Sequence, residues 1–169
     1  FRVLDKYHIY LIQDAYLAAG CFWGVESKLS NLVQVIETAV GYCGGSLNNP
    51  TYKLVCAGDT GHAETVHVVF DDAVISYENL LRYFFQIHDP TQLNRQGFDI
   101  GDNYRSAIFY INDFQKLDAQ NLLNEIGPDF NNMLVTNLEE FKEFFKAEEY
   151  HQKYLAKKLI KSLFPFASI

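Results

Sequence analysis

The pattern of apolar and polar positions predicts a chain in which strands alternate with helices. Apolar spacing predicts a helix that begins near Cys21, an amphipathic helix at 76–87, a helix at 113–126 and a charged helix within 139–159. Alternating or short continuous apolar runs predict strands at 7–12, 15–19, 33–40, 62–70, 107–111 and 133–136. This interleaving predicts a sandwich of helices packed on a sheet.

Turn and cap residues mark the ends of these elements. Ser76 is expected to cap the amphipathic helix, and Thr51 to cap a single helical turn that stops at Gly58. Residues 41–50 are rich in Gly, Asn and Pro and are expected to form a loop. A polar segment at 89–104 reads as a loop of about sixteen residues, a length that is usually functional or disordered.

The stretch Gly20–Gly24 lies between a predicted strand and a predicted helix, and we call it the strand-to-helix corner. It contains Cys21 and Trp23, the only tryptophan of the chain. At a helix N-terminus, free N–H groups and the positive end of the dipole favour an anion. We therefore expect a lowered pKa and a reactive thiolate at Cys21. The alternative is a small buried hydrophobic residue, which is the more common role of a free cysteine.

Composition limits the partners and the compartment. The 169 residues suit one domain, 1–169, and their net charge of −7 argues against nucleic acid and anionic membranes as partners. No run of 18 apolar residues exists, and the first residues lack a signal-peptide pattern. The three cysteines fit a reducing compartment, so a cytoplasmic location is expected. Because the chain begins with Phe1, it could be a processed or trimmed form, or part of a longer polypeptide.

A carboxyl group stands out on an apolar strand face. Glu64 shares its predicted face with Val66, Val68 and Phe70. Burial would raise its pKa and keep it protonated as a general acid, whereas the alternative is an ordinary, partly exposed strand glutamate. The histidines and cysteines show no zinc-ligand spacing, so no metal is expected. Phosphate-loop and serine-hydrolase motifs are also missing from the sequence.

Several segments resemble the peptide-methionine sulfoxide reductase A family, in the right order over about residues 15–156. The most specific are the strand-to-helix corner and the stretch Thr60–Glu64. The resemblance implies an α+β (α/β) sandwich that has a mixed sheet with packed helices and a ferredoxin-like split β-α-β core. The other similar segments are 41–45, 49–52, 58–59, 88–91, 94–97, 104–106, 147–152 and 154–155.

The resemblance also implies an activity and a nucleophile. The family reduces the S epimer of methionine sulfoxide, free or in proteins, and so repairs oxidised proteins. Cys21 matches the family's nucleophile and would become a sulfenic acid. Glu64 would protonate the sulfoxide oxygen, and the hydroxyl groups of Tyr52 and Tyr104 would hold the developing charge. Asp99 would assist by hydrogen bonding, indirectly.

The remaining implications concern substrate binding and recycling. Phe22 and Trp23 would accept the S-methyl group of the substrate. Many family members carry tail cysteines that resolve the sulfenic acid and pass the disulfide to thioredoxin, but residues 157–166 contain none. We hypothesise that Cys43, expected in a flexible loop, is the resolving thiol; Cys56 or an external thiol is the alternative. We expect oxidised proteins or free methionine sulfoxide as substrates and a thioredoxin-like protein as reductant. We expect no other cofactor and a monomeric state.

Two other classes of function stay open from the residues alone. A different thiol enzyme, such as a peroxidase or a cysteine hydrolase, would need a base beside Cys21, and His62 is the residue offered for that role. The second alternative class is a binding module that has the same fold but has lost its catalytic cycle. Turnover of methionine sulfoxide separates the three.

Overall fold

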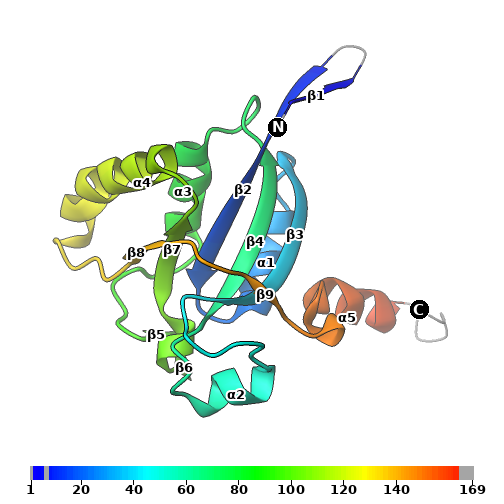
Figure 1. The fold of residues 1–169 in the computed structure, drawn as a ribbon, viewed down its shortest axis with the longest axis vertical. Coiled ribbons are helices and arrows are strands. Elements are labelled where there is room, and N and C mark those ends of the chain that lie inside the picture. Colours follow the sequence, from blue (N-terminus) through cyan, green and yellow to red (C-terminus); the bar gives the residue numbers. More distant parts are fainter. Residues whose placement is uncertain (1, 6–7, 164–169) are drawn as a thin grey trace.

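The fold is a mixed β-sheet covered by helices on one face (Figure 1). The computed structural model describes residues 2–5 and 8–163; residue 7 of the expected leading strand lies outside them. The sheet has the order β8-β7-β2-β4-β3-β9, and β1 pairs with β2. The strands are β1 (Arg2–Asp5), β2 (His8–Ala19), β3 (Val35–Cys43), β4 (Ala63–Asp71), β5 (Arg95–Gln96), β6 (Asp99–Ile100), β7 (Ser106–Tyr110), β8 (Asn137–Glu140) and β9 (Phe145–Lys146).

The described residues also contain five α-helices and three short 3₁₀ turns. The order β2-α1-β3-β4-α3-β7 along the chain, with β7-β2-β4-β3 side by side and antiparallel, is the ferredoxin-like split β-α-β core. Strand β8 pairs with β7 in parallel, which makes the sheet mixed and confirms the predicted fold class. The helices are α1 (Phe22–Ser30), α2 (Tyr52–Ala57), α3 (Tyr77–Gln86), α4 (Asp113–Ile126) and α5 (Tyr154–Leu163); the 3₁₀ turns are η1 (Asp102–Tyr104), η2 (Gly127–Phe130) and η3 (Glu149–His151).

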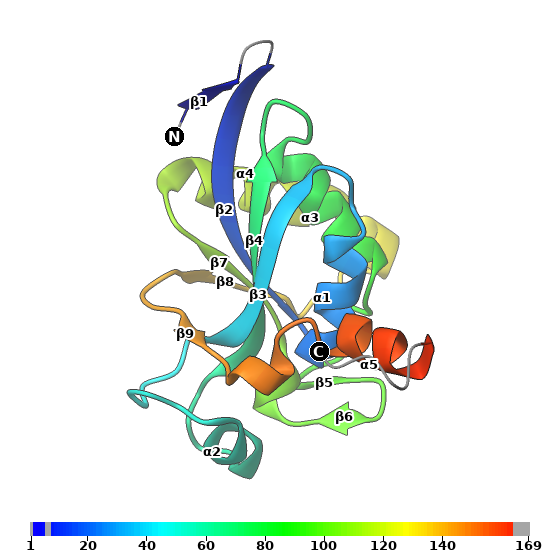
Figure 2. The same cartoon turned by 90° about the vertical axis from the view of Figure 1, so that its right-hand side faces the viewer.

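The main core lies between the sheet and the layer of α1, α3 and α4 (Figure 2). Alternation along β4 directs Val66, Val68 and Phe70 into this core, where they pack with Leu80 and Phe84 of α3. The opposite face of the sheet is packed by a smaller cluster under the β8–β9 segment. The predicted caps are confirmed, because Thr51 Oγ1 and Ser76 Oγ accept backbone hydrogen bonds at the starts of α2 and α3.

Several element boundaries differ from those predicted. The two strands expected at 7–12 and 15–19 form one strand, β2, because its polar residues at 13–14 still pair with β4. Strand β3 continues to Cys43, so residues 41–43 are not loop. Strand β9 packs closely on this part of the strand, so a Cβ on Gly41 would lie 2.4 Å from the Phe145 carbonyl oxygen. The strand expected at 133–136 is instead β8, and the loop at 89–104 contains the β5–β6 hairpin.

No helix among the described residues is both long enough and apolar enough to cross a lipid bilayer.

Candidate active site

The strand-to-helix corner connects β2 to α1 and holds Cys21 directly before the helix. Gly20 has a φ of +94°, and a side chain there would meet Gln96 of the β5–β6 hairpin, so this position requires glycine. The Cys21 carbonyl accepts hydrogen bonds from the N–H groups of Gly24 and Val25 and begins the helix. The side chain of Cys21 is partly exposed, as a residue that must meet a substrate requires.

The pKa of the Cys21 thiol is raised above its ordinary value, so the predicted lowering is wrong in direction. Burial is the largest cause, and the charges of Glu64 and Asp99 raise the pKa further. The N–H groups of Trp23 and Gly24 at the helix N-terminus lower the pKa and offset part of this shift. The resting side chain is therefore a thiol, and the helix N-terminus supplies donors that stabilise the thiolate once it forms.

Glu64 provides a buried carboxyl group next to the same corner. Its residue is 1% exposed, and Oε2 accepts a hydrogen bond of 3.0 Å from the N–H of Phe22. Burial raises its pKa to about 7, more than the Phe22 N–H lowers it, in agreement with the prediction. Among the described residues, Oε1 has no hydrogen-bond partner. A protonated carboxyl with a free oxygen can donate a proton to a bound group.

The two predicted tyrosines come from separate elements and face the same carboxyl. Tyr52 begins α2, where Glu148 Oε1 accepts its N–H at 2.9 Å, and Tyr104 ends η1. Burial is the largest cause of the raised pKa of both phenols, to about 12 for Tyr104, and the charge of Glu64 adds to both shifts. Both hydroxyl groups therefore stay protonated at neutral pH and can donate hydrogen bonds.

Aromatic rings surround the corner, and one of them belongs to a histidine that the sequence reasoning did not single out. The Phe22 ring centroid lies 6.4 Å from that of Trp23 and 6.4 Å from that of Tyr52. The His151 ring lies 5.3 Å from Phe22 and 4.4 Å from Tyr52. The Tyr154 ring stacks on the Trp23 ring, and their centroids lie 4.0 Å apart. The motif at 147–152 was the signal that could have identified His151.

His151 fixes the orientation of Trp23. Its Nδ1 accepts a hydrogen bond of 3.1 Å from Trp23 Nε1, and its residue is 1% exposed. An Nδ1 that accepts must be unprotonated, and burial lowers the pKa of His151, which favours this neutral form. The charge of Glu148, whose Oε2 lies 3.9 Å from Nε2, acts in the opposite direction.

The residue Asp99 lies on the hairpin strand β6 and is exposed. Its charge raises the pKa of both Cys21 and Glu64, so it lies near the two groups without a hydrogen bond to either. This placement is compatible with an indirect influence on the site.

Of the two other cysteines, Cys43 lies away from Glu64. Cys43 pairs with Ala63 and is buried with Ala18 and Phe109, on the face away from Glu64. Burial raises its pKa to about 12. It is the last residue of a strand, so the expected flexible loop at this position is wrong, and the structure does not bring Cys43 to Cys21.

Cys56 shares the site with the two tyrosines. It is exposed, and it lies one turn after Tyr52 on α2, on the same helix face. The nearby hydroxyl groups of Tyr52 and Tyr104 lower the pKa of its thiol, and the charge of Glu64 raises it. Burial, the largest cause, raises the pKa of the Cys56 thiol.

His62, the base that a cysteine hydrolase would need, is committed to backbone contacts. Its Nδ1 accepts the N–H of Gly45 at 3.1 Å, and Nε2 lies 2.8 Å from the Leu47 carbonyl oxygen. Both ring nitrogens are used to hold the loop after β3. Within residues 2–5 and 8–163, no three His, Cys, Asp or Glu side chains group in a way that could hold a metal ion.

A ferredoxin-like domain with a thiol at a helix N-terminus, a protonatable carboxyl beside it and aromatic rings around it defines a thiol enzyme with a built-in acid. The sequence model of the family described as peptide methionine sulfoxide reductase matches residues 13–163. A relative from Methanosarcina acetivorans, peptide methionine sulfoxide reductase MsrA, is 51% identical over 150 residues, which cover 87% of this chain and 79% of that protein.

Solved structures agree with this match. The crystal structure of Mxr1 from Saccharomyces cerevisiae in reduced form has a TM-score of 0.84 and 34% identity, and covers 99% of this chain and 92% of that one. Mxr1 in complex with Trx2 has a TM-score of 0.62 and 25% identity, and covers 89% and 92%. The chain belongs to the peptide methionine sulfoxide reductase family, and it is an oxidoreductase of this class.

The hydrogen bond between Trp23 and His151 predicts a pH-dependent fluorescence signal. Because Trp23 is the only tryptophan, the tryptophan emission of the protein comes from this residue alone. Emission should be constant near neutral pH and should change below the ordinary histidine pKa of about 6.5, as His151 becomes protonated and can no longer accept. His151→Phe, which keeps a ring but has no acceptor, should abolish the transition. An unchanged transition in this variant would contradict the assignment.

Proposed function

We propose that this chain reduces the S epimer of methionine sulfoxide, free or in proteins, with Cys21 as nucleophile and Glu64 as acid. The observation that carries the proposal is the hydrogen bond from the Phe22 N–H to Glu64 Oε2. This hydrogen bond holds the acid next to the residue that follows the nucleophile. The sulfur and the oxygen of one sulfoxide group can therefore meet Cys21 and Glu64 at the same time. The family match supports the choice of substrate.

The first step transfers oxygen from the substrate to Cys21. The thiol loses its proton to water, and the thiolate attacks the sulfoxide sulfur while Glu64 donates a proton to the sulfoxide oxygen. The bond formed between the two sulfur atoms and the bond between the substrate sulfur and its oxygen then break as the hydroxyl group moves to Cys21, and Glu64 regains a proton from water. Two electrons pass from the cysteine sulfur to the substrate sulfur. The net change is thiol plus sulfoxide to sulfenic acid plus methionine, with no other reactant. The N–H groups of Trp23 and Gly24 stabilise the attacking thiolate.

The other residues hold the substrate. The hydroxyl groups of Tyr52 and Tyr104, both protonated at neutral pH, donate to the oxygen as negative charge develops there. Phe22 and Trp23 enclose the S-methyl group, and Asp99 acts indirectly through its charge. Every one of these residues comes from one chain, so the proposal needs no second copy.

Recycling follows a different route from the one expected at Cys43. The position of Cys56 beside Tyr52 and Tyr104 supports Cys56 as the resolving thiol. Its sulfur attacks the sulfenic acid of Cys21, a disulfide forms and water leaves. An exposed disulfide partner is accessible to an external dithiol, and the Mxr1–Trx2 complex supports a thioredoxin-like reductant. The three free cysteines are consistent with a reducing compartment such as the cytoplasm.

The activity is tested with dithiothreitol and each epimer of methionine sulfoxide. The S epimer should be converted to methionine and the R epimer should not. Cys21→Ser should abolish turnover, because serine is a far weaker nucleophile towards sulfur, and Ser27→Ala on the same helix should leave it unchanged. Absence of turnover with either epimer would favour the binding module, and equal turnover of both would contradict the proposed geometry.

The pKa of Glu64 predicts the pH profile of the chemical step. The single-turnover rate of methionine formation, measured without reductant, should rise with pH up to about 7 and level off above it, because the thiolate fraction of Cys21 keeps growing while Glu64 loses its proton. Glu64→Gln should lower the rate by about 10²- to 10⁴-fold and remove this break, so that the rate continues to rise with the thiolate fraction. Glu37→Gln, at an exposed position of β3, serves as the matched control. A break near pH 7 that persists in Glu64→Gln would assign the acid to another group.

The recycling route predicts one disulfide. After a single turnover without reductant, alkylation, denaturation and peptide mass spectrometry should find Cys21 joined to Cys56 and Cys43 as a free thiol. Cys56→Ser should leave a sulfenic acid that dimedone labels, whereas Cys43→Ser should not alter the disulfide. A Cys21–Cys43 disulfide would reverse the assignment, and a lasting sulfenic acid in the unaltered protein would point to direct reduction by an external thiol.

A further inference from the structure

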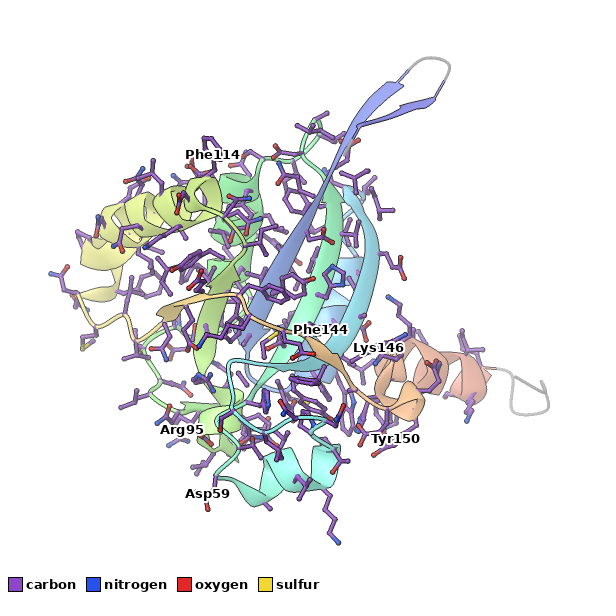
Figure 3. All side chains as sticks on the ribbon, in the orientation of Figure 1. Asp59, Arg95, Phe114, Phe144, Lys146 and Tyr150 are labelled. Atoms are coloured by element: carbon purple, nitrogen blue, oxygen red, sulfur yellow. The ribbon has the colours of Figure 1, made fainter. Side chains whose placement is uncertain are left out.

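The segment 147–152 is attached firmly to the edge of the sheet. It runs from β9 past Tyr150 to α5 (Figure 3). The N–H of Ala147 donates to the Val40 carbonyl oxygen at 2.9 Å. The side chain of Gln152 accepts the N–H of Val40 and donates to its carbonyl oxygen, each at 2.9 Å. Gln152 is buried, so this part of the chain is fixed relative to β3.

Glu148 extends from this segment and joins two other elements through one carboxylate. Its Oε1 accepts the N–H of Tyr52 at 2.9 Å, and its Oε2 accepts the hydroxyl group of Tyr42 at 3.1 Å. Burial acts to raise the pKa of Glu148, but hydrogen bonds that include these two outweigh burial and lower the pKa. The side chain is therefore ionised at neutral pH, and both of its oxygens are acceptors.

Tyr42 is a rigid reference point for this carboxylate. It is fully buried and lies directly opposite Glu64 in the pairing of β3 with β4. Its ring centroid lies 5.9 Å from that of Phe22. A buried hydroxyl group requires a hydrogen-bond partner, and Glu148 Oε2 is that partner. The position of Glu148 is therefore set by the same two strands that hold the acid.

Helix α2 depends on contacts from outside itself. Its six residues are too few for a stable isolated helix, and Val55 is the one described residue of α2 that is buried. The N–H of Tyr52 is one of the N-terminal groups that have no partner within a helix, and Glu148 satisfies it. The ring of Tyr52 lies 4.4 Å from that of His151, between centroids. One short segment thus holds Tyr52 by its backbone and by its ring.

We propose that Glu148 is a positioning residue, which fixes Tyr52 so that its hydroxyl group meets the sulfoxide oxygen. This inference rests on the proposed function, in which Tyr52 donates to that oxygen. A donor stabilises the developing charge when it lies about 2.7–3.1 Å from the place that the charged oxygen will occupy, so a small displacement of α2 removes its contribution. Glu148 itself takes no part in the chemistry and acts through Tyr52.

The test begins with Glu148→Gln, which keeps the shape of the side chain but replaces one acceptor oxygen by an NH₂ group. Either the Tyr52 N–H or the Tyr42 hydroxyl group then loses its acceptor. With saturating methionine S-sulfoxide and no reductant, the single-turnover rate should fall by about 10-fold, and the half-saturating concentration should stay unchanged. Glu149→Gln is the matched control, because it removes the same charge from a side chain that is 79% exposed and should alter neither quantity.

A double-mutant cycle with Tyr52→Phe separates positioning from general structural support. Phenylalanine lacks the hydroxyl group but keeps the ring and the backbone N–H. In the Tyr52→Phe background, Glu148→Gln should change the rate by less than about 2-fold, because the group that it positions is already absent. The break near pH 7, which belongs to Glu64, should remain in Glu148→Gln. Tyr42→Phe removes the other partner of the carboxylate and gives a second cycle, with the same expected result, that does not depend on the folding of Glu148→Gln.

Each other outcome has a separate meaning. Additive losses in the cycles would overturn the inference, because Glu148 would then support the site through other contacts. An unchanged rate in Glu148→Gln would also overturn it. So would loss of the break near pH 7, since the substitution would then have disturbed Glu64. Failure of the unaltered protein to reduce the S-sulfoxide would instead reject the proposed function, and with it the role of Tyr52.

Discussion

One buried hydrogen bond, from the N–H of Phe22 to Glu64 Oε2, connects the parts of this site. It joins the first turn of α1 to strand β4, which are separated by 42 positions in the chain. It satisfies one of the free N–H groups of the helix N-terminus and one oxygen of a carboxyl group in an apolar environment. Because it also lies next to Cys21, the separation between thiol and acid depends on this contact. The aromatic rings and the two tyrosines are arranged around the pair.

The same burial has opposite consequences for the roles proposed for Glu64 and Cys21. It raises the pKa of Glu64 to about 7, so that a substantial fraction of this carboxyl group is protonated at neutral pH. It also raises the pKa of Cys21, which disfavours the thiolate that the proposed reaction requires. The N–H groups at the start of α1 reduce this second effect without removing it. The helix N-terminus thus compensates in part for the desolvation of Cys21, whose side chain is a thiol at neutral pH.

The C-terminal segment completes the site from a distance in sequence. His151 and Tyr154 contact Trp23 from η3 and α5, and the segment between them is anchored on α1. Glu26, 2% exposed, accepts the N–H of Lys153 at 3.0 Å and lies 3.4 Å from its ammonium group. An uncompensated buried carboxylate is costly, so this ion pair fixes where the segment meets the helix. The position of the indole ring therefore depends on residues more than a hundred positions away.

Local sequence was sufficient wherever neighbouring residues decide the outcome. The strand-to-helix corner, the caps at Thr51 and Ser76 and the apolar face around Glu64 follow from turn chemistry and alternation, and all are present in the structure. Tertiary structure alone decided the direction of the Cys21 pKa, because desolvation depends on packing from other elements. It also decided the length of β3. Pairing with β4 and β9 extends that strand to Cys43, and local propensity does not encode this pairing. Because the strand continues, the Cys43 side chain lies on the face away from Glu64, and Cys56 is the cysteine that lies beside the tyrosines.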